Sequence, residues 1–310
     1  MDVDRRDFLR AGIGVTAAAM AGARLASAQQ TPQAPAPDLS RRIKLSLKWG
    51  MISGKASVLE KFQMLKRSGY DAVELDAPSN LNLEEVNEAV RQTGIVVDGV
   101  VDSVHWSQPL SSPDAAVRAQ GMTGLRTALR DCARVKGTTV LLVPAVVNAG
   151  MTYADAYKRS QDEIRRVLEQ AQELGVRIAI ENVWNNFLLS PLEAVRYIDE
   201  FASDAIGWHF DIGNIVNYGW PEQWIRILGK RILKLDVKEF SRKKRDDLGL
   251  WKGFDCEIGE GDIDWKAVRA ALQEIGYSGY AAAEVGGGDE QRLKDVRERM
   301  DRVLNPAKED

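Results

Sequence analysis

From residue 43 onward, the sequence alternates between short β-rich runs and longer segments with helical periodicity. Eight runs rich in β-branched and aliphatic residues are expected to be strands, at residues 43–49, 72–76, 96–103, 138–144, 177–181, 206–211, 232–238 and 279–284. The segments after them predict helices at residues 58–67, 83–92, 113–135, 153–174, 191–201, 221–228, 265–275 and 290–303. Such alternation is typical of parallel strands joined by crossover helices.

The number and order of these units favour a closed barrel. Eight strand–helix units within residues 41–310 match an α/β protein with a single-domain (β/α)8 TIM barrel. An open doubly wound sheet would usually carry a Gly-rich phosphate turn after its first strand, but residues 50–57 read GMISGKAS. The glycines just past five predicted helices are expected to be left-handed caps: Gly69, Gly94, Gly137, Gly175 and Gly276.

The first 40 residues are expected to lie outside the barrel. Residues 1–28 contain an arginine pair followed by Phe8 and Leu9, then an apolar run rich in Ala and Gly, and Ala-Ser-Ala at its end. This order is typical of a twin-arginine export signal, and residues 29–40 are a Pro-rich linker. We therefore expect export to the periplasm or the extracellular space, with no stable membrane anchor once the signal is cleaved.

Charge and residue usage narrow the partners. The chain has 42 basic and 45 acidic residues, and its net charge of -3 offers no positive surplus for nucleic acid or an anionic membrane. It has only two histidines and two cysteines, so any metal must be held mostly by oxygen. We expect a small-molecule ligand, and the sequence leaves open whether the chain forms a homo-oligomer.

Acidic side chains stand at or near the ends of five predicted strands. They are Glu74, Glu181, Asp211, Asp236 and Glu284. In a barrel of this type the C-terminal ends of the strands meet at the active-site mouth. Carboxylates gathered there repel one another unless a cation or shared protons neutralise them. A divalent metal would do so, and the alternative is that each acid caps a helix or pairs with a base such as Lys48, Lys234 or Lys238.

The segments around these acids carry a resemblance. IAIENVW, HFDIGN, KLDVKEF and the stretch from GEGDID to AAAEV resemble strands of the xylose isomerase-like superfamily. Its members include sugar-phosphate isomerase/epimerases, ketose 3-epimerases, hydroxypyruvate isomerases, inosose dehydratases and endonuclease IV. The resemblance implies that Glu181, Asp211 and Glu284 are three of four metal ligands, with the two glutamates as the catalytic pair that removes and returns a proton. It also implies that Arg242 contacts the substrate.

Two positions depart from the family's pattern. Asp236 replaces the usual histidine ligand on the seventh strand, and Asn214 stands where a histidine often follows the strand-six aspartate. With Asp236 as fourth ligand the site is all-oxygen, which favours Mn²⁺ or Mg²⁺ over zinc. Without it, a metal binds more weakly or not at all. His209 is on the same face as Asp211 but is expected to lie too deep to replace the missing ligand.

Other side chains near the strand ends are candidates for substrate contact. They are Lys48, Glu74, His105, Trp106, Trp184, Asn214, Lys238 and Arg242. Indoles commonly stack on sugar rings, although a rim tryptophan can simply cover the barrel. The loop expected at residues 241–259 is basic at its start and carries Trp251, so it is either a lid or a solvated face.

These features predict a divalent-metal-dependent sugar isomerase or epimerase that removes an α-proton from a keto sugar and forms an enediolate. Glu181 and Glu284 are the expected bases. The same intermediate could expel a β leaving group, so the first alternative is a 3-keto-glycoside lyase, hydrolase or dehydratase. The second is a non-catalytic sugar-binding barrel in which the changes at Asp236 and Asn214 have abolished turnover. An endonuclease is disfavoured by the few histidines and the absence of a basic surplus.

Overall fold

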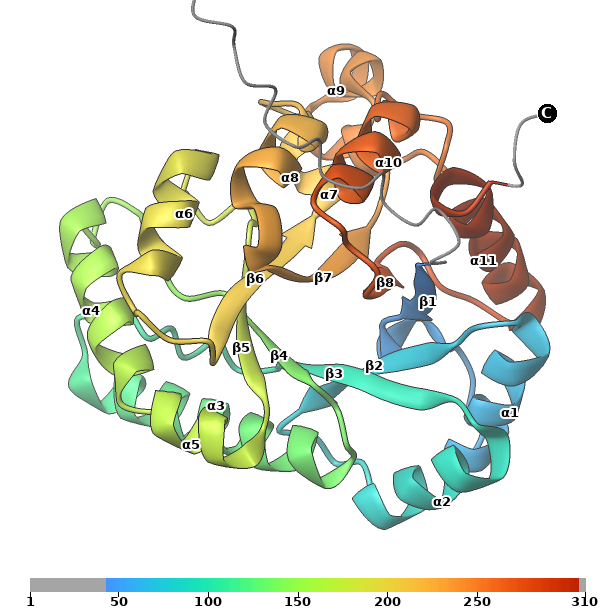
Figure 1. Ribbon diagram of the computed structural model, residues 1–310, viewed down its shortest axis with the longest axis horizontal. Coiled ribbons are helices and arrows are strands. Elements are labelled where there is room, and N and C mark those ends of the chain that lie inside the picture. The colour runs from blue at the N-terminus through green and yellow to red at the C-terminus, as the bar shows by residue number, and fades with distance from the viewer. Residues whose placement is uncertain (1–42, 307–310) are drawn as a thin grey trace, which may run out of the picture. The chain divides into compact units, whose positions relative to one another are not determined.

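The computed structural model describes residues 43–306 of the chain, and the predicted signal (1–28) and linker (29–40) lie outside these described residues. Eight parallel strands form one sheet in the order β1-β8-β7-β6-β5-β4-β3-β2, with helices around it (Figure 1). A bridge between Lys48 and Glu74 joins the two edges, β1 and β2. The sheet is therefore a nearly closed barrel, and the predicted single-domain TIM barrel is confirmed.

The strands lie close to their predicted positions. Their bounds are β1 (Lys44–Leu47), β2 (Ala72–Ala77), β3 (Val96–Asp102), β4 (Thr139–Leu142), β5 (Arg177–Glu181), β6 (Ile206–Asp211), β7 (Ile232–Val237) and β8 (Tyr280–Ala283). The bounds of β5 and β6 are those predicted. These are the strands in which an apolar run ends on an acid, which marks the last residue of the strand.

Helices surround the strands, and two of them were not predicted. The helices are α1 (Val58–Ser68), α2 (Leu83–Thr93), α3 (Ala115–Arg134), α4 (Tyr153–Arg165), α5 (Leu168–Leu174), α6 (Pro191–Asp199), α7 (Ile212–Val216), α8 (Pro221–Leu228), α9 (Arg242–Leu248), α10 (Trp265–Glu274) and α11 (Glu290–Leu304). Three 3-10 turns are η2 (Trp49–Met51), η3 (Gly229–Arg231) and η4 (Leu250–Phe254). The single helix predicted at 153–174 is two helices, because the backbone leaves the helical region at Val167, where φ is -122°.

Most of the predicted glycine caps are confirmed. The φ angles run from 65° to 83° at Gly69, Gly94, Gly175 and Gly276. The prediction for Gly137 is wrong, because the left-handed residue there is Lys136, with φ of 61°. A glycine is needed at position 137 for close packing, because a Cβ there would lie 2.7 Å from Cys132 Sγ.

The alternation of side chains along each strand separates an apolar shell from a charged interior. Ile180, Phe210 and Leu235 are fully buried and belong to the hydrophobic core. Their neighbours along the strands, such as Glu181 and Asp236, are buried acids. The fold thus concentrates charge inside the barrel, toward the mouth.

Within residues 43–306, no helix combines the length and apolarity needed to span a bilayer.

Candidate functional site

Strand β7 sets up the charged interior. Lys234 and Asp236 alternate with the core residue Leu235, and Lys238 continues the series just past the end of the strand. Since successive side chains of a strand point to opposite faces, these three charged side chains share the inner face. The pairing of β6 with β7 sets Asp211 opposite Asp236.

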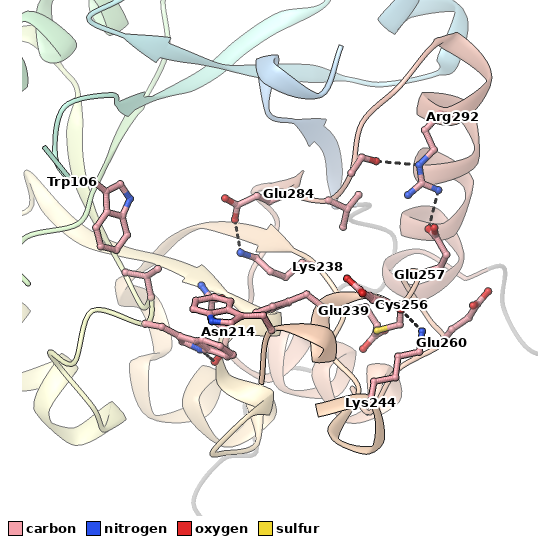
Figure 2. Close-up of a pocket in the computed structure, with 17 residues that line it drawn as sticks. Trp106, Asn214, Lys238, Glu239, Lys244, Cys256, Glu257, Glu260, Glu284 and Arg292 are labelled. Carbon is pink, nitrogen blue, oxygen red and sulfur yellow. Dashed lines mark hydrogen bonds and ion pairs between the residues drawn. The ribbon is translucent and has the colours of Figure 1, made fainter. Parts of the chain in front are cut away.

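Four acids converge at the mouth, and we call them the mouth cluster. They are Glu181 at the end of β5, Asp211 at the end of β6, Asp236 on β7 and Glu284 just after β8. One carboxylate oxygen from each lies within 4.8 Å of the others. Lys238 Nζ lies 2.8 Å from Asp211 Oδ2 and 2.7 Å from Glu284 Oε2, the second contact being visible in Figure 2. The structure therefore brings together the four acids predicted to bind a metal.

Below the mouth lies a second group of charges, the deep network, made up of Lys48, Glu74, Asp98 and Lys234. Lys234 Nζ lies 2.7 Å from Glu74 Oε1 and 2.8 Å from Asp98 Oδ2. Lys48 Nζ contacts Glu74 and lies 2.7 Å from Asp236 Oδ2, so it links the two groups. Two bases face two acids in this network, and all four side chains are buried or nearly so.

The acids of the mouth cluster do not all remain readily ionised. Burial raises the pKa of Glu181 well above its usual value, and the charges of Glu284 and Asp211 raise it further. Burial also raises the pKa of Asp211 to about 7, although the Lys238 ammonium acts in the opposite direction. For Lys238, burial favours the neutral amine, but Asp211 and Glu284 outweigh it and raise the pKa well above its usual value. The mouth thus requires protons or a further cation.

The deep network behaves differently. Burial alone would raise the pKa of Glu74, but the ammonium groups of Lys234 and Lys48 lower it to about 2. Asp236, at the boundary, is also buried, yet His209 and Lys48 hold its pKa well below the usual range. His209 Nε2 lies 2.9 Å from Asp236 Oδ1 and is fully buried, so it supports that carboxylate from beneath.

The residues of the mouth cluster fit a divalent metal. All four donors are carboxylates, and Mg²⁺ and Mn²⁺ prefer oxygen ligands. Asp211 Oδ2, Glu284 Oε2 and both oxygens of Asp236 are buried without a well-directed hydrogen bond from the described residues, although ammonium or imidazole groups lie beside them. A divalent cation bound here would replace these ammonium and imidazole groups as the partners of the four oxygens.

Two adjoining cavities open at the mouth. The smaller cavity, of about 530 Å³, is lined by Glu181, Lys48 and His105 among others. The larger cavity, of about 740 Å³, includes Trp184 and Asn214 and extends to η4 and α11. Both cavities share Trp106, Val183, Lys238, Glu284 and Val285. Asp211, Asp236 and Glu74 lie fully buried and line neither cavity.

Comparison with known proteins places this barrel in a family. The model of the Xylose isomerase-like TIM barrel family matches residues 62–305. The chain belongs to this family. L-ribulose-5-phosphate 3-epimerase UlaE of Escherichia coli O1:K1 / APEC is 27% identical over 254 residues, which cover 78% of this chain and 86% of UlaE.

Solved structures show the same barrel. D-psicose 3-epimerase, determined in the presence of D-fructose, matches with a TM-score of 0.70 at 19% identity, covering 86% of this chain and all of the other. The 3-keto-D-glucoside 4-epimerase YcjR of E. coli also matches with a TM-score of 0.70, at 18% identity and with coverage of 84% of this chain and 99% of YcjR. At these identities the likeness concerns the fold of the family.

Arg242, which the resemblance implied as a substrate contact, is directed elsewhere in this member of the family. Its guanidinium donates to the carbonyl oxygens of Val216 and Gly219, each at 2.9 Å. It also lies over the ring of Trp220, 5.6 Å from the centroid. Arg242 is not among the residues that line the two cavities. Its spacing from Asp236 could not reveal the direction of a side chain on α9.

Sequence reasoning missed Asp76, which lines the smaller cavity. Asp76 is the next-to-last residue of β2 and follows Glu74 by two residues, so the alternation of side chains along the strand could have revealed it. The predicted loop at 241–259 is largely regular structure, since it contains α9 and η4. Glu239 anchors its base by accepting hydrogen bonds from Gly259 N at 2.8 Å and from Trp265 Nε1 at 2.9 Å.

Proposed function

We propose that this chain is a divalent-metal-dependent isomerase or epimerase that removes an α-proton from a neutral keto sugar. The convergence of the mouth cluster on a cavity that both Glu181 and Glu284 line carries the proposal. Glu181, Asp211, Asp236 and Glu284 would hold the metal. When bound, Mn²⁺ or Mg²⁺ would stabilise the negative charge that develops on the sugar oxygen as the proton leaves.

Glu181 and Glu284 come from strands that are not neighbours in the barrel. A sugar in the smaller cavity therefore meets a carboxylate from two directions. One glutamate takes the proton from the α-carbon onto a carboxylate oxygen, and the other, protonated, returns a proton to the same carbon from its own side. Burial and the neighbouring acids raise the pKa of Glu181, which favours the protonated form of this carboxyl. No net proton is gained or lost.

His105 is suited to orient the sugar. Burial lowers the pKa of His105 to about 3, so the imidazole is neutral. Its Nδ1 accepts a hydrogen bond from Val143 N at 3.2 Å, which leaves the proton on Nε2. We infer that this N–H donates to a hydroxyl or carbonyl oxygen of the substrate.

The charge of the smaller cavity favours a neutral sugar. Its lining contains the acids Asp76, Glu181 and Glu284 against the bases Lys48 and Lys238. Both lysines are already paired with carboxylates. The lining therefore offers a phosphate group no basic side chain that lacks a carboxylate partner. UlaE is named for a phosphorylated sugar, whereas D-psicose 3-epimerase and YcjR are named for sugars without phosphate, and the latter pair fits this cavity better.

Deuterium exchange tests the proposal directly. The Mn²⁺-loaded protein is incubated in deuterated water with a panel of ketoses and 3-keto-glycosides, and deuterium uptake at the α-carbon is followed by NMR. We expect uptake for at least one sugar, and a loss of about 10²–10⁴-fold in Glu181→Gln and in Glu284→Gln. Glu173→Gln, on an exposed position of α5, is the control for the loss of a carboxylate.

The products separate the alternatives. Uptake with inversion at the α-carbon identifies an epimerase, and release of an aglycone identifies a lyase. Sugar binding without exchange on any member of the panel would leave the non-catalytic barrel as the correct description. Exchange in Glu284→Gln at the rate of the unaltered protein would remove that residue from the catalytic pair.

A further inference from the structure

The larger cavity adjoins the smaller one across the Lys238–Glu284 ion pair. In Figure 2, Lys238 and Glu284 lie in the middle, with Trp106 on one side and Arg292, Glu257 and other charged residues on the opposite side. Glu181 lines the smaller cavity but not the larger one. The reacting carbon therefore belongs in the smaller cavity, and the larger one is space beside it. Each cavity lies within the range of about 300–1,000 Å³ that encloses a whole small ligand.

One wall of the larger cavity is an aromatic platform formed by Trp184, Trp251 and Phe254. The ring centroids of Trp251 and Phe254 each lie 5.0 Å from that of Trp184. Trp184 Nε1 donates to Asn214 O at 2.8 Å, which fixes the orientation of this indole. The platform is thus tied to α7, next to the mouth cluster.

Trp251 is unusually open for such a large side chain, since 68% of its surface is exposed. Trp106, which also lines the larger cavity, is 49% exposed. Exposed indoles beside a polar rim offer an apolar face to a ligand that also carries hydroxyl groups. The C–H face of a pyranose ring has this character, whereas its hydroxyl groups point outward to the rim.

The rim supplies polar partners and excludes an anionic ligand. Five acids and three bases line the larger cavity: Glu239, Asp255, Glu257, Glu260 and Glu284, against Lys238, Lys244 and Arg292. Arg292 is already paired with Glu257 at 2.9 Å. A phosphate or carboxylate ligand would meet a net negative wall. A neutral ligand rich in hydroxyl groups would not.

We propose that the larger cavity is a subsite for a second, neutral sugar ring, so that the substrate is a glycoside that spans both cavities. The second ring stacks on the platform, and the oxidised ring reaches Glu181 and Glu284. The assignment of the oxidised ring to the smaller cavity rests on the proposed function, whereas the contact of the platform with the second ring of a two-ring ligand does not.

Binding of sugars that cannot enolise tests the subsite separately from catalysis. The methyl glycosides of cellobiose and maltose are the two-ring probes and methyl glucoside is the one-ring probe, with affinities measured by isothermal titration calorimetry. Their blocked anomeric carbons leave no carbonyl group to enolise. We expect at least one two-ring probe to bind about tenfold or more tightly than methyl glucoside, and Trp251→Ala to remove about tenfold of that affinity while the affinity for methyl glucoside stays the same. Saturation-transfer NMR should show contact to both rings.

Trp220→Ala is the matched control. Trp220 is also an exposed tryptophan, but it does not line either cavity. This variant should bind every probe as the unaltered protein does. Equal affinity for one and two rings, or an equal loss for both in Trp251→Ala, would overturn the subsite. A dimer that sedimentation shows to dissociate in Trp251→Ala would assign the platform to a second copy of the chain instead.

The two proposals can fail separately. Deuterium exchange on a keto-monosaccharide, without preference for two rings, would retain the proposed function and reject the subsite. Tight disaccharide binding that depends on Trp251, with no exchange on any keto sugar, would retain the subsite and reject the catalytic proposal.

Discussion

The deep network and the mouth cluster are made of the same residue types, a few ångströms apart, yet their electrostatics differ. In the deep network Lys48 and Lys234 face Glu74 and Asp98. The pKa of Glu74 falls to about 2, whereas burial raises the pKa of Asp98 despite its contact with Lys234. In the mouth cluster, Lys238 contacts Asp211 and Glu284, while Asp236 is paired with Lys48 and His209 from below. There burial raises the pKa values of Glu181 and Asp211, whereas Asp236, although buried, has its pKa held well below the usual range by His209 and Lys48. Matched charges stabilise the barrel, whereas unmatched acids leave room for a cation and for proton transfer.

The largest effect is expected from breaking the deep network. Lys234→Met would leave Glu74 and Asp98 buried without their shared ammonium, which should lower the free energy of unfolding by about 3–5 kcal/mol. Urea denaturation measures this. Adding Asp98→Asn should restore part of the loss. Lys243→Met, which breaks an exposed pair with Asp247, should leave the free energy of unfolding nearly unchanged. Equal losses in both lysine variants would contradict the comparison.

Asp102 lies outside both regions and tests the effect of burial on a carboxyl group by itself. Burial raises the pKa of this carboxyl to about 7. The folded state then holds the proton more tightly than the unfolded chain, whose Asp pKa is about 3.9, so stability falls as pH rises from about 4 to 7. Asp102→Asn should therefore be more stable at pH 8, by at most about 4 kcal/mol, and equal to the unaltered protein near pH 3.5.

Urea midpoints at several pH values check this expectation. The substitution keeps the oxygen that accepts from Val104 N at 3.2 Å. Asp204→Asn, at an exposed position, is the control for the loss of a carboxylate. A gain from Asp102→Asn of the same size at pH 3.5 and pH 8 would show that its origin is not the proton.

Mn²⁺ binding to the mouth cluster should change the free energy of unfolding by less than the loss of Lys234 from the deep network does. Mn²⁺ at 100 times its Kd should stabilise the protein by about 2.7 kcal/mol, and EDTA should reverse the gain. Lys238→Met should enlarge the Mn²⁺-induced rise in Tm, because Asp211 and Glu284 lose their ammonium partner. An unchanged rise in the double variant Asp211→Asn, Glu284→Gln would place the ion elsewhere.

Local patterns in the sequence predicted the barrel and the four acids of the mouth cluster. The acid that ends each of β5 and β6 fixed both a strand boundary and a site residue, because strand alternation and barrel topology bring such ends together. The pairing of Lys234 with Glu74 joins residues 160 apart, and no local pattern specifies which lysine meets which acid. The direction of Arg242 likewise depends on the carbonyl groups of Val216, which ends α7, and of Gly219, which lies between α7 and α8. The break before α5 lies where the helical pattern continues but the backbone turns.

The inner face of β7 has a consequence for how this barrel can change. Lys234, Asp236 and Lys238 are spaced two residues apart, so inserting or deleting a single amino acid at the start of the strand would turn all three toward the apolar shell. Three unpaired charges would then meet helices, and the folded state would be lost. Length variation among descendants of this sequence should therefore be tolerated in the segments that join strands to helices and be excluded from β7.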